Sequence, residues 1–113
     1  MPPSGFSQEA INGLLEFIRA IYQKTLDKYR DEDLTEESIL QDSIKYLNGL
    51  IKKSVSVALD GTVSPEGIKG LQKFVSINFR DLIAEIHEGK KQEGKAMQTE
   101  LEQIGKYLED FKI

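Results

Sequence analysis

The chain has 113 residues with one histidine and no cysteine, and 15 basic against 19 acidic residues give it a net charge of −4. A chain of this length is typical of a single domain with a modest core, so we expect one domain over 1–113. The composition excludes disulfides, thiolate metal sites and cysteine nucleophiles, and it lacks the basic excess that binding of a nucleic-acid backbone requires.

The N-terminal stretch MPPSGFSQEA lacks the positive segment followed by an apolar run that marks a signal peptide. No stretch of the sequence has the uninterrupted apolar length that spans a bilayer. We therefore expect a cytoplasmic protein that does not enter a membrane.

Helix starts are marked at 6–11, 34–39 and 63–68 by a shared pattern: an apolar residue, Ser or Thr, any residue, Glu, any residue and Ile. The hydroxyl is expected to accept a hydrogen bond from a first-turn amide. The flanking apolar residues are expected to pack together as a hydrophobic staple. The caps predicted in this way are Ser7, Thr35 and Ser64.

The first predicted helix covers 7–30, where apolar residues recur at helical spacing until the polar run RDED. The second covers 35–59 and ends before Asp60 and Gly61, where the glycine is expected to form a left-handed C-cap. The last residues of this helix, VSVAL at 55–59, alternate and are β-branched. An extended segment is the alternative there, although a lone strand would lack a partner.

The third predicted helix covers 64–88, with Pro65 in its first turn, where the missing N–H costs nothing, and Gly89 as its stop. The fourth covers 93–111; it has no good cap, but its apolar residues step by four and three positions. Short connections between long helices place neighbours antiparallel. The sequence therefore predicts an all-α fold, an up-down-up-down four-helix bundle.

An internal repeat is suggested by the window FSQEAINGLLEF at 6–17, which returns in part as VSPEGIKGLQKF at 63–74. Ser, Glu, Ile, Gly, Leu and Phe stand at the same places in both windows. These matches are compatible with two copies of one αα-hairpin, 6–60 and 63–112, that bury their apolar stripes against each other. The alternative is that any capped amphipathic helix shows such a pattern.

Gly13 and Gly70 are equivalent in this repeat, and each lies inside a predicted helix. A glycine in a helix costs about 1 kcal/mol relative to alanine, so each needs a reason. We expect a close contact between the first and third helices at these two glycines.

The stretches GFSQEAINGLLEF and ELEQIGKYLEDF resemble segments of short uncharacterised helical proteins of cyanobacteria. In those proteins the first motif leads into the second within one hairpin. The resemblance involves both ends of this chain and implies no activity.

His87 suggests a histidine phosphotransfer protein, a class that also consists of small acidic four-helix bundles. In such proteins the sequence that starts at the active histidine resembles H-x-x-K-G. Here Lys90 stands at the right offset from His87, but Lys91 stands where the glycine belongs. His87 also falls near the end of its predicted helix, where an imidazole interacts well with the helix dipole and needs no other role. Phosphotransfer through His87 is therefore the alternative hypothesis.

Several aromatic residues lie off the main apolar stripes of the predicted helices. Phe17 and Phe74 match in the repeat, and we expect them to widen the core face of their helices. A second pair of aromatic residues follows lysines and suits a core boundary or an interaction surface equally well. That possible interaction surface comprises Tyr46, Tyr107, Lys45 and Lys106.

Other site patterns have weaker support. The segment 60–67 resembles half of a calcium loop but lacks the oxygen ligands that calcium needs. The acidic residues over 31–37 lie at a helix start, where acids are favourable in any case. The lysines over 90–95 have no interleaved aromatics for base stacking. No catalytic motif is present, so we expect no enzyme, no cofactor and no metal.

The function that the sequence favours is a non-catalytic protein-interaction or scaffold module, with a protein partner or a second copy of the chain as its ligand. The alternative is phosphotransfer through His87.

Overall fold

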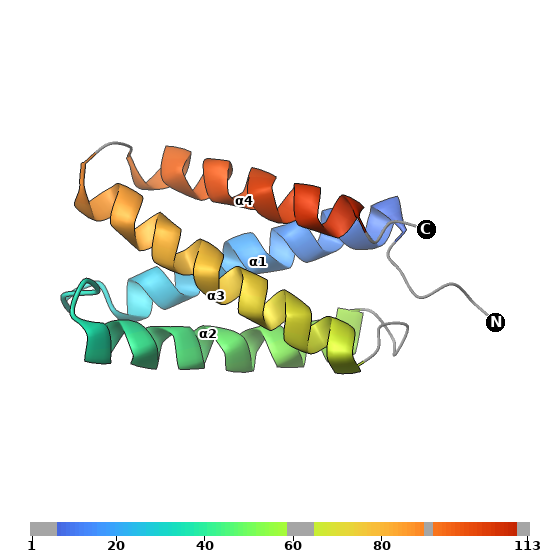
Figure 1. Ribbon diagram of the computed structural model, residues 1–113, viewed down its shortest axis with the longest axis horizontal. Coiled ribbons are helices and arrows are strands. Elements are labelled where there is room, and N and C mark those ends of the chain that lie inside the picture. The colour runs from blue at the N-terminus through green and yellow to red at the C-terminus, as the bar shows by residue number, and fades with distance from the viewer. Residues whose placement is uncertain (1–6, 59–64, 90–91, 111–113) are drawn as a thin grey trace.

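The computed structural model describes residues 7–58, 65–89 and 92–110, and these residues form a bundle of four α-helices (Figure 1). The predicted all-α four-helix bundle is therefore confirmed, with helix ends close to those expected. The segment at 55–58 is helical. The helices are α1 (Gln8–Lys28), α2 (Glu37–Ala58), α3 (Pro65–His87) and α4 (Glu93–Glu109).

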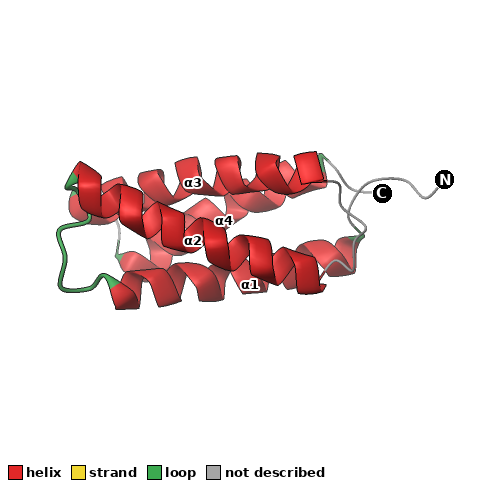
Figure 2. Ribbon diagram, turned by 90° about the horizontal axis from the view of Figure 1, so that it is seen from below, coloured by secondary structure: helices red, strands yellow, loops and turns green. Residues whose placement is uncertain are grey.

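Each helix packs along two neighbours, so that the four helices form a ring. The packed pairs are α1 with α2, α2 with α3, α3 with α4, and α4 with α1. Consecutive helices run in opposite directions in the colour gradient of Figure 1, and Figure 2 shows the same bundle from a second side. In this arrangement α1 and α3 lie on one diagonal of the bundle, and α2 and α4 lie on the other.

The helix ends follow local hydrogen bonding. Ser7 caps α1 as predicted, because its hydroxyl accepts a hydrogen bond of 3.1 Å from the amide of Ala10. At the end of α3, Gly89 adopts a φ of 68°, and its N–H donates to the carbonyl of Ile86, so the predicted stop is confirmed. The staple at Phe6 and the caps at Gly61 and Ser64 lie outside the described residues.

The cap predicted at Thr35 is wrong. Both the amide and the hydroxyl of Thr35 donate to the carboxylate of Asp33, so this side chain belongs to the preceding turn. Helix α2 begins two residues later, at Glu37, and the carbonyl of Glu36 accepts the first helical hydrogen bond, from Leu40. An aspartate that engages a hydroxyl two residues away competes with helix capping in this way.

The buried core contains most of the apolar residues that recur at helical spacing in the sequence. It also includes further residues beside this apolar stripe on three of the helices. Tyr22 of α1 and Phe79 of α3 are fully buried, and their ring centroids lie 5.4 Å apart at the centre of the bundle. Helices in a ring of four need a broad apolar face because each contacts two neighbours and the diagonal. The buried residues that widen the stripes are Leu14, Ile21, Ile83 and Ala96.

The outer faces of the helices are mainly polar, but Phe17 on α1 and Ile77 on α3 are exposed. Within the described ranges, no helix combines the length and the apolar character needed to cross a membrane.

Candidate functional site

A groove runs along the surface between α1 and α4. It consists of three open hollows with volumes of about 570, 310 and 320 Å³. Neighbouring hollows share lining residues: Leu15 and Gly105 belong to the first two, and Glu16 and Arg19 to the last two. The hollows therefore form one feature, the α1–α4 groove, whose apolar floor consists of half-buried Leu15, exposed Ala20 and the margins of three buried core residues, Ile11, Met97 and Leu101.

Glycines on α4 leave this groove open. A Cβ placed on Gly105 would lie 3.6 Å from a methyl carbon of Leu15, and a Cβ on Gly94 would meet nothing within 4 Å. Both glycines line the hollows. Longer side chains at these two positions would project into the space above the apolar floor.

The rim of the α1–α4 groove is charged, and its acidic residues outnumber its basic ones. The basic residues are Arg19 and Lys106. The acidic residues are Glu16, Glu102, Glu109 and Asp110. The groove thus combines an apolar floor with a rim of negative charge.

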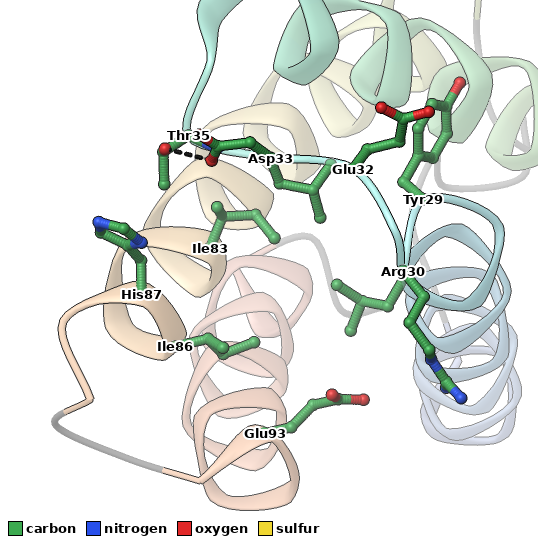
Figure 3. A pocket seen from close by; sticks show the side chains of 11 residues that line it. Tyr29, Arg30, Glu32, Asp33, Thr35, Ile83, Ile86, His87 and Glu93 are labelled. Carbon is green, nitrogen blue, oxygen red and sulfur yellow. Dashed lines mark hydrogen bonds between the residues drawn. The ribbon is translucent and has the colours of Figure 1, made fainter.

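A separate hollow, of about 260 Å³, lies away from the groove, at the end of the bundle where α1 joins α2 (Figure 3). We call it the end pocket. Its apolar walls are Leu26, Leu34, Ile83 and Ile86. Its rim is polar and consists of Tyr29, Arg30, Glu32, Asp33, Thr35, His87 and Glu93.

The polar groups of the end pocket are partly occupied by contacts within the chain. Hydrogen bonds from the hydroxyl and the amide of Thr35 hold the pKa of Asp33 below its ordinary value. The carboxylate of Glu93 accepts a hydrogen bond of 3.3 Å from the side chain of Gln23. Among the described residues, no cluster of histidine, aspartate and glutamate has the arrangement of a metal site.

His87 lies at the last position of α3, as the sequence indicated, and its exposed side chain lines the rim of the end pocket (Figure 3). The imidazole is accessible to a partner. It stands at a helix terminus rather than on the middle of a helix face, and Lys90 and Lys91 lie outside the described residues.

The four residues of the sequence-predicted interaction surface do not lie together. Tyr46 packs edge-on against Tyr29, between α1 and α2, and the ammonium of Lys28 lies 3.8 Å from the centre of the Tyr46 ring. Tyr107 stacks on Phe74, between α3 and α4, with ring centroids 4.3 Å apart. These two helix pairs lie on opposite sides of the ring of helices.

The lysines of that predicted surface are also separated. Lys45 is exposed on α2, and Lys106 is exposed on α4 at the rim of the α1–α4 groove. One of the four predicted residues therefore belongs to the groove.

The predicted close contact between Gly13 and Gly70 is wrong. A Cβ on Gly13 would meet no side chain or neighbouring helix within 4 Å. A Cβ on Gly70 would lie 3.2 Å from the hydroxyl of Tyr107, which belongs to α4 and not to α1. The physical reason is that α1 and α3 face each other across the diagonal, where large side chains such as Tyr22 and Phe79 fill the space.

The aromatic pair Phe17 and Phe74 also differs from the expectation. Phe74 is half-buried and packs against the core, but Phe17 is 43% exposed. Phe17 therefore does not widen the core, although it matches Phe74 in the sequence.

A buried polar chain that the sequence did not reveal links three helices. The hydroxyl of Tyr22 on α1 donates to the side-chain carbonyl of Asn78 on α3, at 2.5 Å. The amide nitrogen of Asn78 donates to the carboxylate of Glu100 on α4, at 2.8 Å, and to the Glu100 backbone carbonyl, at 3.0 Å. Burial raises the pKa of Tyr22 well above its ordinary value, and the charges of Glu100 and Asp81 raise it further.

Asn78 and Glu100 are each 4% exposed and Tyr22 is fully buried, so a ligand in the α1–α4 groove or in the end pocket would not reach them. Their groups hydrogen-bond with one another across helices. This arrangement fixes the relative positions of α1, α3 and α4, which is a structural role.

A scan against known family models and searches of the curated proteins and of the solved structures found no match to this chain. The function must therefore be inferred from the geometry of the surfaces described above.

Proposed function

We propose that the protein is a non-catalytic interaction module that binds a helical segment of a protein partner in the α1–α4 groove. The observation that carries this proposal is the continuity of the groove, from Gln8 and Glu109 at one end to Gln23 and Gly94 at the other. An open groove with an apolar floor between two helices is the usual receptor for the apolar face of an amphipathic helix.

The dimensions of the groove support this ligand. The stretch of α1 from Gln8 to Gln23 rises about 22 Å at 1.5 Å per residue, which matches about four turns of a bound helix. Small residues at Ala20, Gly94 and Gly105 would permit a bound backbone to approach closely. Leu15 and Ala20, the accessible residues of the floor, would supply apolar contact to the bound helix.

The side chains of the groove also support a binding role rather than a chemical one. Its described lining combines apolar, amide and charged side chains, without histidine, serine or threonine. A nucleophilic hydroxyl activated by an imidazole, as in a serine–histidine pair, is therefore absent from this described lining.

The test uses two matched glycine-to-leucine variants as baits in extracts of the native host. Gly105→Leu fills the groove, whereas Gly49→Leu makes the same change on the exposed face of α2, where a Cβ meets nothing within 4 Å. We expect partner proteins to bind the unmodified chain and Gly49→Leu, and to be lost with Gly105→Leu. Equal retention by both variants, or no specific retention by any bait, would reject the proposal.

Phosphotransfer through His87 is the second candidate, because the exposed imidazole is accessible at the rim of the end pocket. Incubation with a small phosphoryl donor tests it directly. An acid-labile phosphoryl label that disappears in His87→Gln would favour this function over the interaction module.

A further inference from the structure

We propose that the ligand of the α1–α4 groove is a basic amphipathic helix, with an apolar stripe flanked on both sides by lysine or arginine. This inference rests on the proposed function and adds the chemistry of the partner. Charge complementarity between the groove rim and the flanks of the bound helix carries it.

The acidic side chains of the rim are available to a partner. Glu16, Glu102, Glu109 and Asp110 are all exposed. Within the described part of the chain, the ion pairs are Arg30 with Asp27 and Arg80 with Glu37, and neither pair involves the groove. The rim carboxylates therefore form no close ion pair with a cation of the described residues, and they outnumber the two rim cations, Arg19 and Lys106.

Acidic residues stand on both walls of the groove. Glu16 belongs to α1, whereas Glu102 and Glu109 belong to α4, and Asp110 follows directly after α4. A helix seated on the floor would place one flank beside each wall. Lysine or arginine on both flanks would then face carboxylates, while their alkyl stems would cover the edges of the apolar floor.

The same charges disfavour a second copy of this chain as the occupant. Two copies that met through their α1–α4 grooves would bring two acidic rims together, and like charges across an interface oppose association. The rim cations Arg19 and Lys106 are fewer than the carboxylates and would not balance them.

The test measures the binding of three labelled 15-residue helical peptides to the full chain by fluorescence anisotropy. The peptides share one apolar stripe and differ in their flanks, which carry lysine, glutamine or glutamate. We expect the lysine peptide to bind about tenfold more tightly than the glutamine peptide, since several exposed ion pairs each contribute modestly. The glutamate peptide is expected not to bind, and added salt to weaken the binding of the lysine peptide.

Matched charge variants connect the preference to the groove. Glu16→Gln combined with Glu102→Gln is expected to abolish most of the advantage of the lysine peptide. Asp42→Asn combined with Glu66→Gln removes the same charge from exposed sites outside the groove and is expected to leave the advantage unchanged.

The remaining outcomes separate this inference from the proposed function. If the lysine and glutamine peptides bind equally and Gly105→Leu blocks both, the groove binds helices but the basic partner is wrong. If no peptide binds and the chain forms a dimer that Gly105→Leu disrupts, the occupant is a second copy and the inference is wrong. If no peptide binds and the chain stays monomeric, both proposals fail.

Discussion

Asn78 is the residue on which the centre of the bundle depends, because its side chain uses its carbonyl and its amide at once. The carbonyl accepts from Tyr22 and the amide donates to Glu100, so one side chain joins α1, α3 and α4. In the buried interior these hydrogen bonds are strong, and a group left unpaired there is costly. Such a chain of partners selects one register among the many that apolar stripes would permit.

Replacement of Asn78 by leucine should destabilise the protein by about 3 kcal/mol, because it removes the amide donor from the buried carboxylate of Glu100. It also leaves the Tyr22 hydroxyl with only the more distant carbonyl of Val75, at 3.4 Å, as acceptor. The measurement is the free energy of unfolding in urea. Adding Glu100→Leu should restore a large part of the loss, since replacing both polar partners by apolar groups is far less costly than replacing one. A double variant whose loss equals the sum of the two single losses would refute the coupling.

Tyr22 should make the stability fall at high pH. Burial raises its pKa in the folded state, so above about pH 10 the unfolded chain loses the phenolic proton first. The contribution is complete below pH 10 and is lost as the pH rises, with a slope of at most about 1.4 kcal/mol per pH unit.

The control for Tyr22 is Tyr22→Phe, compared with the unmodified chain in urea unfolding from pH 8 to pH 11. The variant should be less stable by about 1 kcal/mol at pH 8, because it lacks the hydrogen bond to Asn78. The difference should shrink and then reverse as the pH rises. Parallel pH curves would show that the hydroxyl ionises without penalty in the folded state.

The two repeated glycines should respond differently to alanine. Gly13→Ala should stabilise the protein by about 1 kcal/mol, since the new methyl group meets open space and alanine favours the helix. Gly70→Ala should gain less or lose stability, because the hydroxyl of Tyr107 lies 3.2 Å from the new atom. In a Tyr107→Phe background the full gain should return at position 70, as measured by thermal unfolding. Equal gains at both positions in the unmodified background would contradict this account.

Most of the apolar residues of the core could be predicted from the sequence, but the buried hydrogen bonds of Asn78 and Glu100 could not. Asn78 stands between Ile77 and Phe79, and Glu100 lies in the run TELEQ, which reads as a solvated helix face. Nothing local marks either residue as buried. Their burial follows from the register between α3 and α4, which brings the two side chains within 2.8 Å.

The four helices differ in how their ends are satisfied. Ser7 caps α1 and Gly89 ends α3 with local hydrogen bonds that a sequence pattern can predict. The cap predicted at Thr35 does not form, because Asp33, two residues earlier, engages the same hydroxyl. Helix α4 begins after Gln92, which has extended backbone angles, φ −68° and ψ 155°, but makes no side-chain capping bond.

Replacement of Gln92 by serine should therefore stabilise α4, by about 0.5 to 1 kcal/mol, because the backbone already has the conformation in which a serine hydroxyl reaches a first-turn amide. Urea unfolding measures the gain. Gln103→Ser, in the exposed interior of α4, provides the matched change and should lower the stability slightly. A loss at position 92 comparable to that at position 103 would show that the cap does not form.

The whole molecule combines a predictable bundle with a surface that emerges from tertiary register. Helical periodicity and short connections are properties of the sequence, so the four-helix bundle could be predicted. The α1–α4 groove depends on the contact between α1 and α4, which places Leu15 and Gly105 at the same hollows although they lie far apart in the chain. No local pattern encodes that contact.

The proposed duplication of 6–60 and 63–112 stays a prediction. One aromatic contact agrees with it and another does not. Tyr22 and Phe79, which continue the spacing between the windows 6–17 and 63–74, meet at the centre of the bundle. Tyr46 and Tyr107 match in the sequence but pack differently: Tyr46 contacts Tyr29 beyond the end of α1, whereas Tyr107 contacts Phe74 inside α3. The Lys-Tyr-Leu runs at 45–47 and 106–108 therefore do not place their tyrosines in equivalent surroundings.

NMR of the isotopically labelled chain during titration with the basic helical peptide locates the binding surface directly. If the peptide binds in the α1–α4 groove, the largest amide shifts should centre on Leu15, Arg19, Gln98 and Gly105. Shifts that centre instead on Thr35 and His87 in the end pocket, or on Phe74 and Tyr107 between α3 and α4, would contradict binding in this groove.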